Sequence, residues 1–280
     1  MELTNLYWTC AGIYPGGVEI SRFGFRDRVE AAAAAGFTGI GIWHADLEHT
    51  LGGMSLAEMR AILAGNGIHN VELEFLTDWF VGGERKAASD ARKRLLLGAA
   101  EALAGLGRVH LKVGDFDRTP APFEQIVESY RVLCDEAADY GALVAFEFMA
   151  SAMIGNLREA RALVEQAGAP NGGLAIDIAH VVDCGVEYAE IRELPGQYIV
   201  SVELNDGLQR GSVGYNPGAR RFCGEGEFDI AGFVQAVRAA GYRGPWAVEV
   251  FAPGLAGLGL AELNRLAYGP TVAQLARTVE

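Results

Sequence analysis

The sequence predicts an α/β fold in which eight parallel strands, each followed by a helix, close into a (β/α)8 barrel. Short β-branched or aromatic runs alternate with longer Ala- and Leu-rich stretches along the chain, which is typical of repeated strand-helix units. The length of 280 residues is close to that of a barrel with eight such units. No Pro/Ser-rich linker divides the chain, so we expect one domain over residues 1–280.

The apolar runs place the expected strands. They lie near residues 3–9, 37–43, 69–76, 108–113, 142–148, 173–177, 198–204 and 245–250. Each run is short and rich in β-branched or aromatic residues, as buried strands of a parallel sheet are. Eight runs are the number that a closed barrel requires.

Helices are expected in the stretches that separate the strands. They lie near residues 22–35, 55–66, 86–104, 123–140, 157–167, 186–193, 229–240 and 259–278. Ser55 and Asp229 suit helix starts, and glycines such as Gly36 and Gly141 follow helix ends. Four similar phrases, among them AAGFTGI and ADYGALV, end a helix and begin the next strand within a few residues. This repeat is therefore structural.

Net charge, cysteine spacing and the length of the apolar runs limit the classes of partner and location that we expect. A net charge of −13 disfavours a nucleic-acid binder, which would present a basic face. The four cysteines form no CxxC pair, so reduced thiols are expected in place of a disulfide frame or a zinc knot. The apolar stretches 29–35 and 95–106 are shorter than the roughly 18 residues of a membrane span, and the first residues do not resemble a signal peptide. We expect a soluble, cytoplasmic protein with a small-molecule partner; a homo-oligomer stays open.

Four carboxylates stand near the ends of the last four expected strands. They belong to the runs VAFEFM, LAIDIAH, IVSVELND and WAVEVF and are Glu147, Asp177, Glu203 and Glu249. A buried carboxylate is costly unless it is paired or bound to a metal. Neighbouring strands lie about 4.8 Å apart, and barrel active sites form at the carboxyl ends of the strands, so the four acids are expected to converge.

A divalent metal would hold such a cluster together. Hard cations such as Mn²⁺ or Mg²⁺ prefer oxygen ligands, whereas Zn²⁺ (or Co²⁺) is less expected because these strand ends offer few nitrogen or sulfur donors. The alternative for any single acid is an ion pair with a nearby Lys or Arg.

The chain resembles the xylose isomerase-like TIM barrels, a superfamily that includes sugar epimerases, inosose dehydratases, dehydroshikimate dehydratases and, more distantly, endonuclease IV. The resemblance covers essentially the whole chain. It rests on the Glu of VAFEFM, the DIAH phrase at 177–180, VELND at 202–206, FCGEGEFDI at 222–230 and GYRGPWAVEV at 241–250.

The resemblance implies a metal held by Glu147, Asp177, Glu203 and Glu249, with His180 near the substrate. Many members have His where this chain has Glu203, so this site is more anionic. Endonuclease IV-like members carry several more His ligands than the five histidines here allow, which disfavours DNA repair. In the resembling epimerases the acids that match Glu147 and Glu249 also move protons.

Other candidates surround this set. A metal-bound carboxylate is a weak base, so His180 is a candidate catalytic group. Lys112 is a candidate to donate to a substrate oxygen or to pair with a carboxylate. Glu74 is a candidate catalytic acid if its side of the third strand faces the barrel interior; the alternative is an outward-facing side chain. Trp43 is a candidate pocket wall, although core packing explains it equally well.

The Gly-rich stretch 205–228 is the longest irregular segment, and we expect it to be a lid over the site. Its arginines, Arg210, Arg220 and Arg221, are candidates to hold a substrate oxygen or phosphate, with a surface role as the alternative for each.

The function predicted first is a metal-dependent isomerase or epimerase that abstracts a proton next to the carbonyl of a sugar, keto-sugar or polyol, through a metal-stabilised enediolate. The alternative is a lyase that dehydrates a cyclic keto-polyol such as an inosose or dehydroshikimate. A non-catalytic sugar-binding barrel is the third hypothesis, because fold alone does not exclude it.

Overall fold

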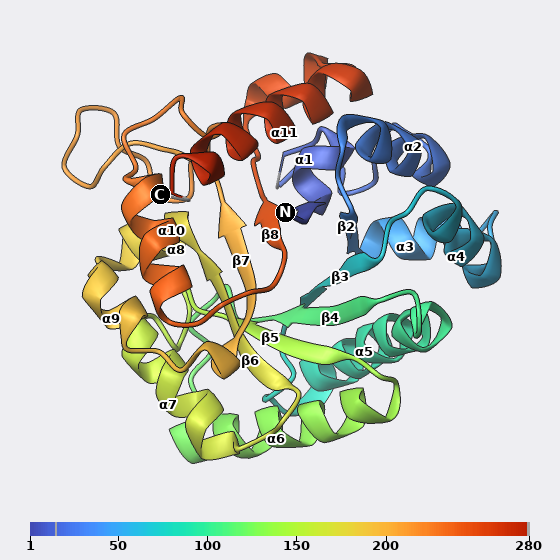
Figure 1. The fold of residues 1–280 in the computed structure, drawn as a ribbon. Coiled ribbons are helices and arrows are strands. Elements are labelled where there is room, and N and C mark those ends of the chain that lie inside the picture. The colour runs from blue at the N-terminus through green and yellow to red at the C-terminus, as the bar shows by residue number, and fades with distance from the viewer. Residues whose placement is uncertain (15, 279–280) are drawn as a thin grey trace.

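The strands close into one barrel. The computed structural model describes residues 1–14 and 16–278, and its strands follow one another around the barrel in chain order, with parallel pairing throughout, including β8 to β1 (Figure 1). The strands are β1 (Leu3–Asn5), β2 (Gly39–Trp43), β3 (Asn70–Leu76), β4 (Arg108–Val113), β5 (Leu143–Glu147), β6 (Gly172–Asp177), β7 (Ile199–Leu204) and β8 (Trp246–Val248). The predicted (β/α)8 TIM barrel is confirmed.

Helices surround this barrel. They are α1 (Tyr7–Ala11), α2 (Phe25–Ala35), α3 (His44–Leu51), α4 (Leu56–Gly65), α5 (Gly83–Leu103), α6 (Phe123–Asp139), α7 (Leu157–Ala167), α8 (Ile178–Cys184), α9 (Tyr188–Arg192), α10 (Ile230–Ala239) and α11 (Leu260–Ala276), with short 3-10 turns η1 (Gly196–Tyr198) and η2 (Pro253–Gly257). Local chemistry fixes their starts: Ser55 and Glu58 form a reciprocal capping box on α4, and Asp229 caps α10. No helix in the described ranges is long and apolar enough to cross a membrane.

Three short helices differ from the prediction. Residues 7–9, predicted as the end of the first strand, begin α1, which stops where Gly12 adopts a left-handed conformation. Helices α3 and α8 follow β2 and β6 directly, and the sequence did not predict them. The Asp177 carboxylate starts α8 by accepting a hydrogen bond from the Ala179 amide. A site residue thus also serves as a helix cap.

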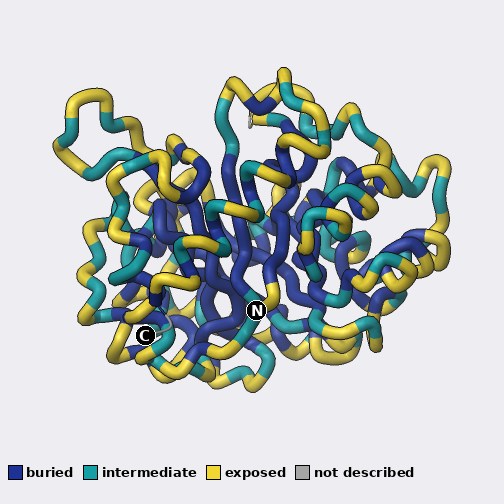
Figure 2. Tube along the Cα trace, turned by 45° about the horizontal axis from the view of Figure 1, so that its top comes forward, coloured by how far each residue is buried: buried dark blue, intermediate teal, exposed yellow. Residues whose placement is uncertain are grey.

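The apolar core lies mainly between the strands and the helices, where buried backbone is enclosed by exposed helix faces and loops (Figure 2). Inside the barrel the apolar contribution is small and centres on Ala145, Ala175 and Val200. Side chains two residues apart on a strand share a face. The polar residues that take these interior positions are Glu72, Glu74, His110, Lys112, Ser201 and Glu203, all buried.

Candidate active site

The four predicted carboxylates meet at the carboxyl ends of β5 to β8. Glu147 and Asp177 are the last residues of their strands, and Glu203 is paired in register with Asp177. Glu249 follows the last residue of β8, and its amide still donates to the carbonyl of Leu204, 3.3 Å away. Each is at most 4% exposed. One oxygen from each lies within 4.8 Å of the others.

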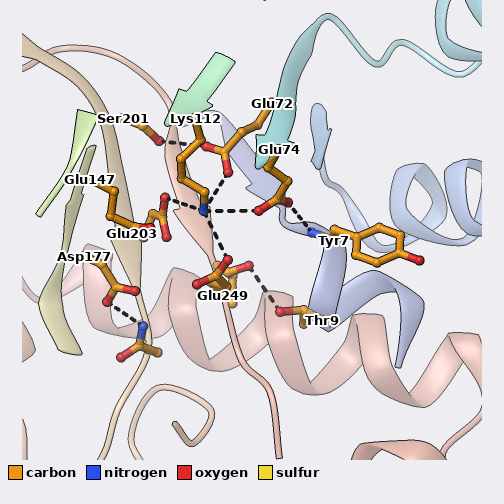
Figure 3. A network of polar contacts seen from close by, with 12 residues as sticks. Tyr7, Thr9, Glu72, Glu74, Lys112, Glu147, Asp177, Ser201, Glu203 and Glu249 are labelled. Carbon is orange, nitrogen blue, oxygen red and sulfur yellow. Dashed lines mark hydrogen bonds and ion pairs between the residues drawn. The ribbon is translucent and has the colours of Figure 1, made fainter. Parts of the chain in front are cut away.

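Lys112 occupies the centre of the barrel and is surrounded by carboxylates (Figure 3). Its Nζ lies 3.0 Å from Glu203 Oε1 and 3.1 Å from Glu249 Oε1. On the other side it lies 2.9 Å from Glu72 Oε1 and 3.3 Å from Glu74 Oε2. The side chain is 1% exposed. Burial opposes its charge, but the four acids raise the pKa of Lys112 well above its usual range, so it stays an ammonium.

Side chains from β4 and β7 hold Glu72 of β3 in place. The Oε2 of Glu72 lies 2.7 Å from His110 Nε2 and accepts a hydrogen bond from Ser201 Oγ at 3.4 Å. Burial alone raises the pKa of Glu72, yet Lys112 and His110 together lower it to about 2. Glu72 is therefore the permanently ionised partner of Lys112.

Glu74 has the opposite character. Its Oε1 accepts a hydrogen bond from the Tyr7 amide at the start of α1, 3.2 Å away. Burial, opposed by Lys112 and reinforced by nearby acids, raises the pKa of Glu74 to about 8, so this carboxyl group is protonated at neutral pH. The neighbouring strand makes room for it: a Cβ at Gly41 would lie 2.7 Å from Glu74 Oε1 and 2.5 Å from the Tyr7 amide nitrogen.

Arg220 reaches the site from the long segment between β7 and α10. Its guanidinium pairs with Asp177 Oδ2 and, at 3.2 Å, with Glu249 Oε2, and it lies 4.1 Å from the centre of the Phe251 ring. The other oxygen of Asp177 accepts hydrogen bonds from the Ala179 amide and from Asn205 Nδ2. These contacts lower the pKa of Asp177 against the effect of burial.

His180 lies between Arg220 and Glu147. Its Nε2 is 3.3 Å from Arg220 Nη2 and 3.7 Å from Glu147 Oε1. Burial is the main reason that the pKa of His180 falls to about 4, so the imidazole is neutral. Because an arginine only donates, the Nε2 atom accepts and carries a lone pair.

The cluster has a deficit of positive charge. Six buried carboxylates (Glu72, Glu74, Glu147, Asp177, Glu203, Glu249) surround two cations, Lys112 and Arg220. Four of their buried oxygens have no hydrogen-bond partner among the described residues. Those of Glu72 and Glu74 still form ion pairs with Lys112, whereas Glu147 Oε1 and Glu203 Oε2 contact neither Lys112 nor Arg220. Burial raises the pKa of Glu147 to about 8 and that of Glu203 well above its usual range. An all-oxygen set with unpaired atoms fits a hard divalent cation.

A cavity of about 320 Å³ opens above these groups. Its charged wall comprises Glu19, Glu74, Glu147, Glu249, Lys112 and Arg220. Its aromatic wall comprises Trp8, Trp43, Phe75, Phe116 and Phe251. Trp43 is anchored by its indole N–H, which donates to Glu19 Oε2 at 2.9 Å.

The sequence matches the family described as "Xylose isomerase-like TIM barrel" over residues 29–269. The chain belongs to the xylose isomerase-like TIM barrel family. Among its relatives are the 3-dehydroshikimate dehydratases of Pseudomonas aeruginosa, 30% identical over 233 residues, and of Pseudomonas putida, 29% identical over 237 residues. The matches cover 81% of this chain, whereas the chain spans only 36% of the length of either relative.

Solved xylose isomerase-like barrels share the fold. The IolI protein with a bound zinc atom matches all of this chain and all of its own with a TM-score of 0.87 at 18% identity. A fusion of such a barrel with 4-hydroxyphenylpyruvate dioxygenase gives 0.82 at 23% identity and covers 99% of this chain and 43% of its own. D-Allulose 3-epimerase from Methylomonas sp. gives 0.73 at 20% identity, with 98% and 97% covered.

This xylose isomerase-like barrel brings most of the predicted site residues together. Eight of them lie at the carboxyl ends of the strands or in the cavity wall: Glu147, Asp177, Glu203, Glu249, His180, Lys112, Glu74 and Trp43. Arg210 does not: its side chain is exposed and lies against Gly185, outside the cavity wall. The loop arginine in the site is Arg220, because the segment folds back after its exposed tip. Sequence reasoning missed Glu19, which stands in an irregular loop and carries no pattern.

Proposed function

We propose that this chain is a lyase that removes water from a small cyclic hydroxyketone, starting with loss of the proton next to the carbonyl group. One observation carries the proposal: four convergent, partly unpaired carboxylates lie beside a neutral histidine, and Glu147, Glu249 and His180 of this set line one open cavity. Such a constellation suits proton abstraction next to a carbonyl.

Glu147, Asp177, Glu203 and Glu249 would hold a divalent cation, with Mn²⁺ or Mg²⁺ favoured by the oxygen donors. When bound, the cation polarises the substrate carbonyl and stabilises the negative charge that develops on its oxygen. The zinc in the related IolI structure and the unpaired oxygens of Glu147 and Glu203 support this assignment.

His180 and Glu74 have the protonation states that elimination needs. His180 Nε2 carries a lone pair and, after release of its single 3.3 Å contact with Arg220, takes the proton from carbon, because acids bound to the cation would be weaker bases. Glu74, protonated at neutral pH, gives its proton to the departing β-hydroxyl group, which leaves as water while the C=C bond forms. The two groups come from β3 and from the helix after β6, on different sides of the barrel. Proton return from His180 to Glu74 through solvent restores the starting state.

Two observations favour elimination over isomerisation. The relatives at 29–30% identity are dehydratases. In addition, both oxygens of Glu249 are engaged, one by Lys112 and the other by Arg220. An epimerase needs a free proton-transfer group on each face of its substrate, and Glu249 would have to leave these partners first.

Isomerisation or epimerisation, the function placed first from the sequence, is the second candidate. The observation that favours it is the position of Glu147 and Glu249, whose oxygens converge from β5 and β8. Epimerases of ketohexoses share the fold.

Incubation with a panel of sugars, keto-sugars and cyclitol ketones in D₂O, with and without Mn²⁺, separates the candidates by mass spectrometry. Metal-dependent loss of water identifies the lyase. Deuterium uptake without mass loss identifies the isomerase and contradicts elimination. His180→Gln is expected to remove turnover, whereas exposed His49→Gln is the matched control. Saturable binding without either reaction across the panel would favour a sugar-binding barrel.

A further inference from the structure

We propose that the site selects an uncharged ring and excludes phosphorylated or carboxylated substrates. The inference rests on the proposed function, because it assumes that the substrate lies in the cavity above Lys112. It is carried by three features: the two cations are already paired, backbone amides already donate to the chain's own carboxylates, and Glu19 in the cavity wall forms no ion pair with the described residues.

Both cations in the cavity wall are already neutralised. Lys112 contacts four carboxylates and is 1% exposed, and Arg220 pairs with two and is 3% exposed. Within residues 1–14 and 16–278, no third lysine or arginine lines this cavity. An anionic substrate that paired with either cation would have to displace protein carboxylates and leave them buried and unpaired, which is costly.

Of the backbone donors that often bind phosphate in such barrels, those after β7 are occupied and one after β8 is missing. These sites usually use the loops after the seventh and eighth strands and the start of a short helix. After β7, the Asp206 carboxylate accepts from the amides of Gly207, Gly224 and Phe228 at 2.8, 2.9 and 3.0 Å. After β8, η2 begins with Pro253, which has no N–H.

An amide at the start of each of the short helices α8 and α1, which follow strands β6 and β1, is occupied in the same way. The amide of Ala179 at the start of α8 donates to Asp177, and that of Tyr7 at the start of α1 donates to Glu74. After β7 and at the starts of α8 and α1, these backbone amides therefore already donate to internal carboxylates.

The remaining wall suits a ring with apolar faces and hydroxyl edges. Phe75 stacks on Phe116 with 4.8 Å between ring centres, and Trp43 lies 4.7 Å from Trp8. These rings offer flat contacts to C–H faces. Glu19, fixed by Trp43, adds an acceptor for hydroxyl groups. The volume of about 320 Å³ is near the lower end of ligand cavities, roughly 300–1,000 Å³, and admits one ring.

The test measures binding to the Mn²⁺-loaded protein, separately from turnover, with matched probes. Isothermal calorimetry compares scyllo-inosose with 3-dehydroshikimate, and D-fructose with D-fructose 6-phosphate. We expect each neutral probe to bind at least about tenfold more tightly than its anionic partner. This is the effect expected for one negative charge roughly 10 Å from an unpaired carboxylate at an effective dielectric constant of about 20. Glu19→Gln should narrow the gap several-fold, whereas Glu128→Gln, an exposed acid on α6, should leave it unchanged.

Tighter or equal binding of the anionic probes overturns the inference, as does a failure of both neutral probes to bind. Dehydration of 3-dehydroshikimate with a lower Kd than that of the inosose would support the proposed reaction and overturn the uncharged-substrate inference. A neutral preference in binding without any dehydration would support this inference and contradict the proposed reaction.

Discussion

Lys112 is the residue on which the charge balance of the barrel interior depends. It lies within 3.3 Å of carboxylate oxygens from β3, β7 and the end of β8, so it links three sides of the barrel. Glu203 is one of these partners, and its Oε1 lies 3.0 Å from the Lys112 ammonium.

Lys112→Met should lower the free energy of unfolding by about 3–5 kcal/mol, because it leaves buried carboxylates without a cation. Adding Glu203→Gln should restore part of this loss. Urea denaturation in EDTA measures both. Lys86→Met, at an exposed pair with Asp90, is the control and should change stability by less than about 1 kcal/mol. An unchanged midpoint in Lys112→Met would contradict the central role of this side chain.

Glu74 should impose an alkaline limit on catalysis. Its pKa is raised to about 8, chiefly by burial, so the acid is protonated below that pH and ionised above it. As a proton donor it becomes inactive as the pH rises through about 8, and kcat/KM should fall. Glu74→Gln should reduce kcat by roughly 10²–10⁴-fold and abolish the fall of kcat/KM at alkaline pH. Exposed Glu124→Gln should keep both the rate and this alkaline fall. If the alkaline fall persists in Glu74→Gln, another group causes it.

Among the elements, the segment between β7 and α10 matters most because it delivers Arg220. The segment, orange in Figure 1, loops out and returns through paired backbone hydrogen bonds between Asp206 and Arg221 at 2.9 and 2.7 Å. The buried Asp206 side chain holds both ends of the loop through three backbone amides. The order of the segment thus determines whether Arg220 reaches Asp177.

Asp206→Ala should destabilise the protein by about 2–4 kcal/mol, since three backbone amides, that of Gly207 buried and those of Gly224 and Phe228 in part-buried hydrogen bonds, lose a charged acceptor. It should also expose the loop to limited proteolysis and lower kcat/KM by displacing Arg220. Val213→Ala, at the exposed loop tip, should alter none of these. Wild-type resistance to proteolysis in Asp206→Ala would show that the loop is held by other contacts.

The elements also show how far the sequence could predict this structure. Short apolar runs, four of them with an acid near the end, predicted the strands and the convergence of Glu147, Asp177, Glu203 and Glu249. Helix α8 escaped prediction because it starts on a buried acid whose role as a cap appears only in three dimensions. The fourfold contact of Lys112 depends on distances across the barrel, which no local pattern encodes. Arg220 could not be distinguished from Arg210 without the path of the loop.

At the scale of the whole molecule, the chain carries a charge of −13 and concentrates several of its acids inside the barrel. Burying unpaired carboxylates lowers stability unless a cation compensates. A cation that binds only the folded barrel would therefore stabilise the entire fold.

Mn²⁺ at about 100 times its Kd should stabilise the EDTA-treated protein by about 2.7 kcal/mol, or roughly 5 °C in melting temperature. Asp177→Asn should abolish this shift and reduce bound metal in elemental analysis. Asp135→Asn, an exposed acid on α6, should retain both. A wild-type melting temperature that does not respond to Mn²⁺ would contradict the metal site.

The polar layer formed by Glu72, His110, Ser201 and Lys112 fills space that other barrels pack with branched apolar side chains. Complete replacement of buried ion pairs by apolar residues of similar volume is often stabilising, whereas removal of one partner is not. The layer therefore represents a trade between function and stability. Replacing these residues together with apolar ones should stabilise a scaffold that needs no activity. Replacing any one of them alone should destabilise the protein, so single substitutions during evolution are selected against at each of these positions.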